Sequence, residues 1–420
     1  MIKKDLLKLD IQLFAVQTTT LAAEGNNLSA EMKTYYEKTL LDSAEPKLVH
    51  DQFADKYPIP ANAGKTIEFR KYDSLGKALT PLTEGVTPAG NRLNVTAITA
   101  TINQYGDFIT LSDMLKMTAI DNNIVQATKL LGSQSGRTLD SVTRDVLVGG
   151  TNVAYAPTVS GQTETAVTSR YGLDATAKIT PELVTRAAVF LEGMNADTIG
   201  EDYISIIHPH IGFDIQRNSE WLAAHQYATP ENIYNGELGK IGNVRFIKST
   251  ESKVWRGANL TVASRTLSVK TAITGTAAAT IAVKEAISAA EATALAGRKV
   301  LISGVQYTVV SASNAAAGSA IITIDTAILV AADVVLYPGE AGAGGISIYS
   351  AIVLGAHAYA VTEVEGMGLQ HIVKPLGYAD ELNQKASVGW KATKAAKRLV
   401  EQYMVRLEVA SGFSTTTAEN

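Results

Sequence analysis

The chain has no cysteine among its 420 residues. This absence excludes a disulfide framework, a thiolate nucleophile, a zinc site built on cysteine and an iron–sulfur cluster. Aromatic residues are few, at 6%, and neither sign of charge is in large excess, since 37 lysine and arginine residues stand against 41 aspartate and glutamate residues. A protein that holds nucleic acid by bulk electrostatics carries a strong basic excess, so the composition argues against that class.

A secretory signal and a membrane span are also missing from the sequence. Asp5 and Asp10 interrupt the basic start, and the apolar run Ile11–Val16 is too short for the core of a signal peptide. The longest stretch without charge, between Glu340 and Glu363, contains four glycines and is typical of strands. We therefore expect a soluble protein that is made and used without export.

What the sequence does contain is enough apolar material, 46%, for the cores of two to three domains. Residues 1–28 have little pattern and predict an arm, and apolar residues at three- and four-residue steps predict a helix over 29–50. Alternation with a period of two predicts strands over 65–72 and 94–102. About twenty polar residues join these strands, which predicts a long hairpin that projects from the body.

The clearest helix is predicted over 121–148, with Asp121 as its N-cap and Gly149-Gly150 as its stop. A threonine-rich loop is expected over 151–178. A second helix should begin at Pro181, a favoured first position, and run to about Met194. The run Tyr203–Ile207 predicts a buried strand.

The composition changes between 262 and 345, where charge thins out and alanine, threonine, serine, valine and isoleucine dominate. Glycine and asparagine separate short β-rich runs, which predicts a small β-sandwich or barrel with a flexible glycine-rich exit at 342–345. These runs are Lys299–Ile302, Val305–Val310, Ala320–Ile324 and Val334–Tyr337. A mixed α/β pattern resumes from 346 to 412. The segment is either a tandem domain or a domain inserted into a host that resumes after it.

The first candidate for chemistry is His208-Pro209-His210 at the end of a strand. Two histidines can ligate a metal, but no acidic pair or third histidine near them completes a ligand set. The glycine-rich run Gly339–Gly345 resembles a phosphate-binding loop, yet it lacks the Gly-Lys-Ser/Thr ending, so we interpret it as a hinge.

The remaining candidates are scattered carboxylates and one basic run. Asp107, Asp113 and Glu201-Asp202 have no partner that would pair them as acid and base. The run Lys391–Arg398 could touch nucleic acid, but we interpret it as a helix face that is solvated or paired with acids. The sequence therefore predicts no catalytic, cofactor-binding or metal-binding residues, and it favours a structural or binding protein over an enzyme.

Several short strings, taken in order, resemble the major capsid proteins of tailed bacteriophages, and most closely the phage N4-type major capsid family. The start Leu9–Ala15 is also similar to the start of many capsid proteins of phages that infect Gram-positive hosts. The segment 262–345 departs from the minimal form of the family. The matching strings are Pro81–Pro88, Gln104–Phe108 with Leu111–Asp113, Gly136–Asp140 with Thr143–Leu147, Asn235–Gly242 with Val244–Phe246, and Leu382–Gln384 with Val388–Lys391 and Met404–Arg406.

The resemblance implies an α+β fold of the Hong Kong 97 type, with an inserted all-β domain. Its parts would be an N-terminal arm (1–28), a peripheral domain (29–63, 101–177 and 386–412) with a spine helix (121–148), an extended hairpin loop (64–100), an axial domain (178–261 and 346–385), the insertion (262–345) and a C-terminal tail (413–420).

It also implies a function. The chain would assemble through hexamers and pentamers into an icosahedral phage head around double-stranded DNA, which it would touch non-specifically, without a cofactor and without a membrane. Scaffold and portal proteins would be partners during assembly in the host cytoplasm. Two alternatives from other classes stay open: a surface-layer or adhesin-like protein, and a metal-dependent hydrolase that uses His208 and His210.

Overall fold

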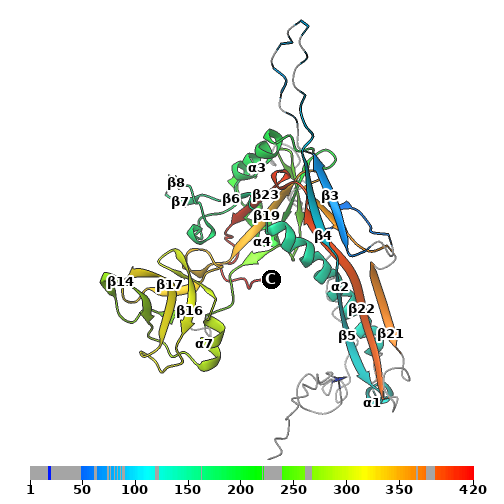
Figure 1. The fold of residues 1–420 in the computed structure, drawn as a ribbon. Coiled ribbons are helices and arrows are strands. Elements are labelled where there is room, and N and C mark those ends of the chain that lie inside the picture. The colour runs from blue at the N-terminus through cyan, green and yellow to red at the C-terminus, as the bar shows by residue number, and fades with distance from the viewer. Residues whose placement is uncertain are drawn as a thin grey trace, which may run out of the picture.

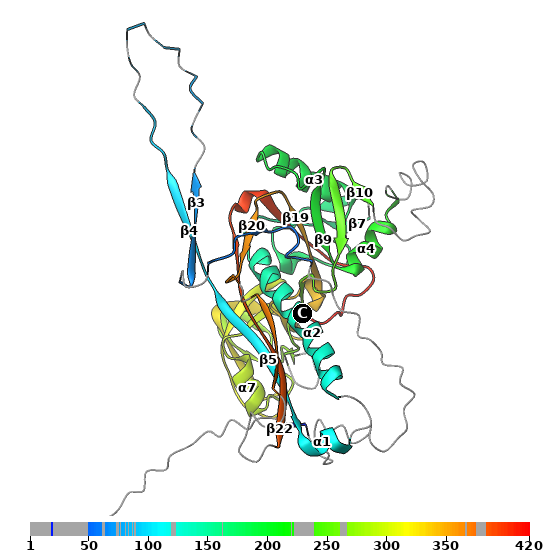
Figure 2. The same ribbon diagram turned by 90° about the vertical axis from the view of Figure 1, so that its right-hand side faces the viewer.

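The structure is a computed structural model with a mixed α+β fold in which strands predominate. It describes residues 18–19, 49–60, 64–72, 75, 77–79, 81–82, 84–85, 87, 90–118, 123–161, 163–219, 221, 239–260, 267–365, 368–374 and 384–420. Two large sheets form the body, a small barrel lies beside it, and a hairpin projects from it (Figures 1 and 2). Among the described residues, no helix is long and apolar enough to span a membrane.

The first sheet is organised around one strand of 14 residues, β22 (Lys385–Arg398). Its antiparallel neighbour β5 (Asn103–Ser112) pairs with it over ten residues, from Lys385 opposite Ser112 to Lys394 opposite Asn103. The other edge of β22 is shared by β21 (Leu369–Lys374) and β20 (Tyr359–Thr362). The short strands β1 (Thr18–Thr19) and β2 (Asp55–Lys56) extend the sheet in parallel, and α1 (Asp113–Thr118) follows β5.

The long helix α2 (Asn123–Val148) crosses one face of this sheet (Figure 2). Leu131 and Leu139 pack against Val388 and Trp390 of β22, so the apolar stripe of the helix covers the apolar positions of the strand. The helix ends at Gly149-Gly150, as predicted. Its last carbonyls are satisfied from outside, because the guanidinium of Arg398 donates to the Val146 carbonyl at 2.7 Å.

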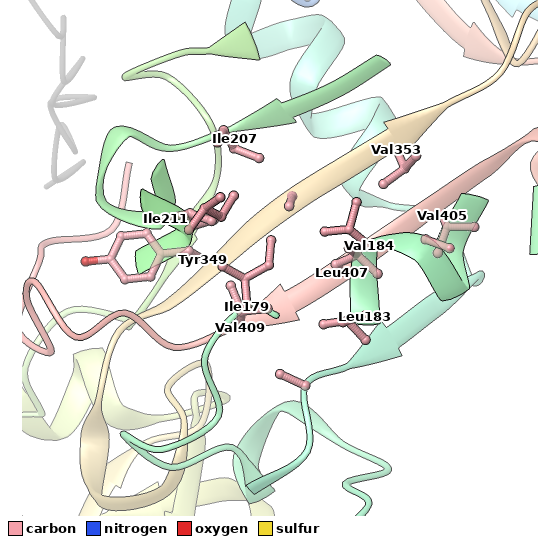
Figure 3. Close-up of a cluster of buried hydrophobic side chains, with 14 of the residues drawn as sticks. Ile179, Leu183, Val184, Ile207, Ile211, Tyr349, Val353, Val405, Leu407 and Val409 are labelled. Carbon is pink, nitrogen blue, oxygen red and sulfur yellow. The ribbon is translucent and has the colours of Figure 1, made fainter. Parts of the chain in front are cut away.

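The second sheet has seven strands and is buried on both faces. Its central strands, β9 (Tyr203–Ile207) and β19 (Ile348–Leu354), are buried at every residue. Helix α3 (Pro181–Gly193) and helix α4 (Pro209–Gln216) cover one face, as Figure 3 shows for Leu183 and Val184 against Val405 and Leu407. The end of α2 covers the other face. In order, the strands are β10 (Lys240–Ile241), β11 (Val244–Lys248), β9 (Tyr203–Ile207), β19 (Ile348–Leu354), β23 (Met404–Val409) and β6 (Val153–Tyr155), with β12 (Val254–Trp255) beside β19.

Six further strands form a small barrel. All of them come from the continuous segment 267–338. The barrel closes because Lys270 N donates to the Ala282 carbonyl at 2.8 Å, which joins the first strand to the last. Its apolar core is its own, drawn from residues 260–336. In sheet order the strands are β13 (Leu267–Ser268), β18 (Val335–Pro338), β15 (Lys299–Ile302), β16 (Val305–Ala312), β17 (Ile321–Val330) and β14 (Ile273–Ala282), with helix α7 (Ala289–Leu295) between β14 and β15.

Most predicted elements are present, but the expectations for three segments are wrong, and so is that for the glycine-rich exit. The expected loop 151–178 contains β6, the hairpin β7 (Thr158–Ser160) and β8 (Thr163–Thr165), and the 3₁₀ turn η2 (Arg170–Gly172). The described parts of 346–412 hold strands and the turn η4 (Glu401–Tyr403) but no α-helix. The basic run 391–398 is a strand rather than a helix face. Apart from the local hairpin of β7 and β8, strand pairing with distant residues overrides the local pattern.

The glycine-rich exit is a packed turn rather than a flexible hinge. Residues Ala343–Gly345 form the turn η3, with Gly344 and Gly345 at positive φ. A Cβ on Gly345 would meet the ring of Tyr337, and one on Gly342 would lie 2.7 Å from the Leu173 carbonyl oxygen. The glycines are therefore there because other atoms approach the backbone closely.

The sheets also group the C-terminal third differently from the expected division into peripheral and axial parts. Strands β20 and β21, expected in the axial domain, pair with β22, whereas β23 and β6, expected in the peripheral domain, belong to the sheet of β9 and β19. The chain thus passes from one sheet to the other and back. The arm before Thr18, most of the predicted helix 29–50 and the predicted cap Asp121 lie outside the described residues.

Candidate intersubunit surface

The longest projection from the body is the predicted hairpin, built by β3 (Thr66–Tyr72) and β4 (Val95–Thr101). The two strands are antiparallel, from Thr66 opposite Thr101 to Tyr72 opposite Val95. Both ribbon views show it extending well beyond the sheets (Figures 1 and 2). Every described residue between 75 and 94 is exposed. The described residues of the hairpin beyond its root therefore make no buried contact with the rest of the chain.

The root of the hairpin is anchored in an apolar cluster. Ile67 and Phe69, on the inward positions of β3, pack with Ala100 of β4 and Ala395 of β22. The rings of Tyr57 and Phe69 meet edge to face, with centroids 5.4 Å apart. This cluster lies on the face of β22 opposite to α2. A root held by packing on one face keeps the projecting part pointed in one direction.

Three leucines are prominent on the projecting part. Leu79, Leu82 and Leu93 are 81%, 78% and 72% exposed, respectively. Burying one such side chain is worth roughly 1.5–3 kcal/mol. Several large apolar side chains gathered on one thin arm mark a surface that contacts another molecule. Charged residues that lie among them, Lys77, Glu84 and Arg92, are exposed as well.

A second exposed apolar surface lies on the first sheet and beside it. Phe108 on β5 is 59% exposed and lies across Gly389 of β22, where a Cβ would be 2.8 Å from the Phe108 Cβ. Leu369 and Val373 on the edge strand β21, and Met114 on α1, are also exposed. No described residue pairs with the outer edge of β21. This edge and these side chains can accept another chain.

A buried polar cluster links α2 to β22. Lys394 forms an ion pair with Asp51 and donates to the Leu139 carbonyl at 2.8 Å. Asp51 also accepts from the Thr143 hydroxyl at 2.6 Å, and His50 Nδ1 lies 2.7 Å from Asp140 Oδ2. Burial lowers the pKa of the Lys394 ammonium, while Asp51 opposes that shift. The side chain of Lys394 in the basic run is therefore buried, and it cannot bind nucleic acid.

A second buried ion cluster joins the turn η2 to the strands β23 and β12. Glu408 on β23 is fully buried and accepts from Arg170 at 2.6 and 2.7 Å and from Arg406 at 2.9 Å. The Arg170 guanidinium also stacks 3.8 Å from the ring centroid of Trp255. Sequence reasoning missed this cluster. The signal in the sequence that could have revealed the cluster is the charged pair Arg406 and Glu408, at alternate positions of an otherwise apolar strand.

His208 and His210 both make hydrogen bonds and ring contacts within the chain. His208 caps α4, since its Nδ1 accepts the His210 backbone N–H at 3.2 Å, and the two rings meet with centroids 4.4 Å apart. His210 Nδ1 lies 2.9 Å from the Tyr349 hydroxyl, and its ring packs on Phe413. Within the described residues, no three histidine, aspartate or glutamate side chains gather as a metal site.

The scattered carboxylates stay apart from one another. Asp107 accepts from the Gln134 amide at 2.6 Å, and Asp113 accepts the Met114 backbone N–H at 2.7 Å. Asp202 forms an exposed pair with Lys240 at 3.3 Å, and Glu201 is exposed in the turn before it. The three aspartates have local structural roles, and no two of these carboxylates face each other as an acid and a base.

No protein-family model and no curated protein sequence matches the chain. Solved structures do match it along nearly its whole length. The capsid structure of the cyanophage P-SCSP1u aligns with 93% of this chain and 96% of its own at 12% identity, with a TM-score of 0.54. The fold is that of phage capsid proteins.

Two further capsid structures agree. The capsid protein of Ralstonia phage GP4 covers 96% of this chain and 100% of its own at 12% identity, with a TM-score of 0.52. That of cyanophage Pam1 covers the same shares at 12% identity, with a TM-score of 0.51. The expectation of an α+β phage capsid fold, made from the sequence strings, is confirmed at this level.

Proposed function

We propose that this chain is the major capsid protein of a tailed bacteriophage and that it assembles through hexamers and pentamers into an icosahedral head around double-stranded DNA. The observation that carries the proposal is the projecting hairpin with its exposed leucines, in a chain with the phage capsid fold. A shell protein makes many modest contacts with identical neighbours, and heterologous contacts of this kind close into rings. The role is structural rather than enzymatic, and its place is the virion, after synthesis in the host cytoplasm.

The finer assignment is to the phage N4-type family and the Hong Kong 97-type architecture. In that scheme 64–100 is the extended loop, α2 is the spine helix, and the sheet of β5 and β22 forms the peripheral domain. The sheet of β9 and β19 then forms the axial domain, with β23 and β6 added to it. Scaffold and portal proteins would be partners during assembly. The net charge of −4 suits a wall that touches DNA without holding it.

The small barrel is proposed to be a domain inserted into the axial domain and exposed on the outer face of the shell. The segments that lead into and out of it lie side by side, because a Cβ on Gly257 would be 2.8 Å from the Cβ of Pro338. In addition, the Arg298 guanidinium donates to the Asn259 carbonyl at 3.0 Å. Ends that meet let an insertion close at little entropic cost, and the barrel's own core gives it independent packing.

Assembly is tested with a hairpin variant. Every described position among residues 74–92 is exposed, so the subunit that lacks this segment is expected to fold and to stay unassembled. Wild-type protein, produced alone or with a scaffold, should give ring-like oligomers and closed shells by negative-stain microscopy and size-exclusion chromatography. The triple variant Leu79→Ser, Leu82→Ser and Leu93→Ser should weaken assembly in the same direction.

The matched control is Val310→Ser on the barrel, another exposed apolar position, which should assemble normally. Wild-type protein that remains monomeric at high concentration, with or without scaffold, would contradict the capsid role. A hairpin deletion that forms normal shells would contradict the role of the hairpin alone.

The inserted barrel is tested by replacing residues 259–337 with a short Gly-Ser linker. If the barrel is an insertion, the shortened chain keeps both large sheets and still assembles into shells. An insoluble shortened chain would show that the barrel belongs to the host core.

A further inference from the structure

The last ten residues, 411–420, form a C-terminal strap that runs across several distant elements. The Arg256 guanidinium donates to the Thr416 carbonyl at 2.6 Å, and the Gly257 backbone N–H donates to Glu419 at 2.8 Å. The side chain of Asn420 accepts the Val254 backbone N–H at 3.0 Å. The strap therefore touches both β12 and the segment that leads into the small barrel.

The first half of the strap is held by the histidine pair and the residues around it. The His210 ring lies between His208 and Phe413, with both centroid distances 4.4 Å. The Tyr349 hydroxyl donates to the Ser414 carbonyl at 2.9 Å. The Ser411 hydroxyl donates to the His210 carbonyl at 3.2 Å, so the backbone of α4 holds the strap too.

The hydrogen bonds define the protonation state that this arrangement requires. His208 Nδ1 accepts a backbone N–H, so it must be unprotonated to cap α4. His210 Nδ1 lies 2.9 Å from the Tyr349 oxygen, and the Tyr349 hydroxyl also contacts the Ser414 carbonyl at 2.9 Å and the Thr417 hydroxyl at 2.6 Å. A second proton on either ring would put positive charge next to the other ring.

The surroundings offer little to stabilise that charge on His208. Burial, with the neighbouring His210, lowers the pKa of His208 to about 4, and burial also lowers the pKa of His210, although Asp214 opposes it. Around the pair, Asp214 accepts the Gly412 backbone N–H at 3.0 Å, and Lys178 lies beside Gly412. Arg217 stacks on Phe213 at the far end of α4, and Tyr349 faces the pair from β19.

We propose that His208 and His210 form an acid-sensitive latch that holds the C-terminal strap in place and releases it when both rings become charged. Protonation of His208 removes the cap of α4 and places two cations in ring contact, on the element that carries the strap. Release of the strap also frees Gly257 and Arg256, and with them the segment that leads into the barrel. The latch does not depend on the proposed assembly and can be tested on unassembled subunits.

The size of the effect follows from linkage. A base whose pKa is lower in the closed state than in the open state destabilises the closed state as the pH falls below the open-state value. With an ordinary value near 6.5 in the open strap, His208 alone shifts the opening equilibrium by about 100-fold at pH 4. Above pH 7 the latch is closed and insensitive to pH.

The experiment is hydrogen exchange of the purified full-length protein at pH 7 and at pH 4, with labelling times scaled for the intrinsic rates. The reporters are the amide of Gly412, which is bonded to Asp214, and that of Ser347, which donates to the Thr415 carbonyl at 2.9 Å. Both amides should lose about 100-fold in protection at pH 4, whereas amides in the core strand β9 should not change.

The decisive variant is His208→Asn, because asparagine keeps a side-chain acceptor for the cap but does not titrate in this range. It should retain the protection of both amides at pH 4. The control His371→Asn changes an exposed histidine on β21 and should behave as wild type. Wild-type protection that is equal at the two pH values overturns the latch. Loss of protection in His208→Asn as large as in wild type shows that His208 does not control the strap and also overturns the latch.

Discussion

Replacing the buried carboxylate of Glu408 should cost a large part of the stability of the seven-stranded sheet. Glu408 has no exposed side-chain surface, and it neutralises Arg170 and Arg406 through three hydrogen bonds of 2.6–2.9 Å. Burial lowers the pKa of the Arg406 guanidinium. The Glu408 carboxylate opposes this shift, because it favours the charged form of the arginine. In Glu408→Gln the shape is kept and the charge is lost, so two neighbouring cations remain without their counterion.

The cost of removing one partner of a buried ion pair is about 3–5 kcal/mol. A domain is stable by only about 5–15 kcal/mol, so this change removes a substantial fraction. The assay is urea unfolding of unassembled subunits, followed by tryptophan fluorescence, because Trp255 lies under Arg170 and reports on this site. The midpoint for the sheet should fall strongly, and added salt should restore little of the loss because the cluster is buried.

The matched control is Glu182→Gln in the exposed pair between Glu182 and Arg186 on α3, with 3.1 Å between the charged atoms. An exposed pair of this spacing contributes about 0.3–0.5 kcal/mol, and that contribution is screened by salt. The reasoning is refuted if the two glutamine variants lower the midpoint equally. It is also refuted if Glu408→Gln is stabilising, since the cluster would then cost more in desolvation than it returns.

Two further pairs of variants test local geometry, and the midpoint of unfolding is compared within each pair. Gly345→Ala should lower the free energy of unfolding by about 1–3 kcal/mol more than Gly344→Ala. Both glycines have positive φ, but only a Cβ on Gly345 would meet the ring of Tyr337. Equal effects of the two variants would contradict the close approach. Thr180→Ala should cost about 1 kcal/mol by removing the acceptor of the Leu183 backbone N–H, while Thr185→Ala on the exposed face of α3 should stay within about 0.5 kcal/mol.

The elements with strong local signals were predictable. The helix α2 was expected over 121–148 and is observed as Asn123–Val148, and α3 begins at the predicted proline. The hairpin strands β3 and β4 followed from alternation, and β15 from a short apolar run between turn residues. These patterns survive because each element buries the face that its own sequence marks as apolar.

The errors came where pairing with distant residues decides the structure. The lysines and arginine of 391–398 suggested a helix face, but β5 and β21 hydrogen-bond to this run as a strand, and Asp51 neutralises Lys394 from more than three hundred residues away. The glycines at 342–345 suggested flexibility, but their neighbours include Tyr337 and the Leu173 carbonyl. The buried Glu408 cluster was not foreseen, since Arg170 comes from a turn more than two hundred residues before Arg406 and Glu408 on β23.

By itself, the sequence determined which segments become helix, hairpin and β-rich barrel, because period, caps and turn residues act within one element. It also carried the likeness to phage capsid proteins that the solved structures support. Only the tertiary structure decided which sheet each C-terminal strand joins, which charges are buried as pairs, and how the strap meets the histidines. Those outcomes depend on contacts between residues far apart in the chain, whose energies no local window of the sequence contains.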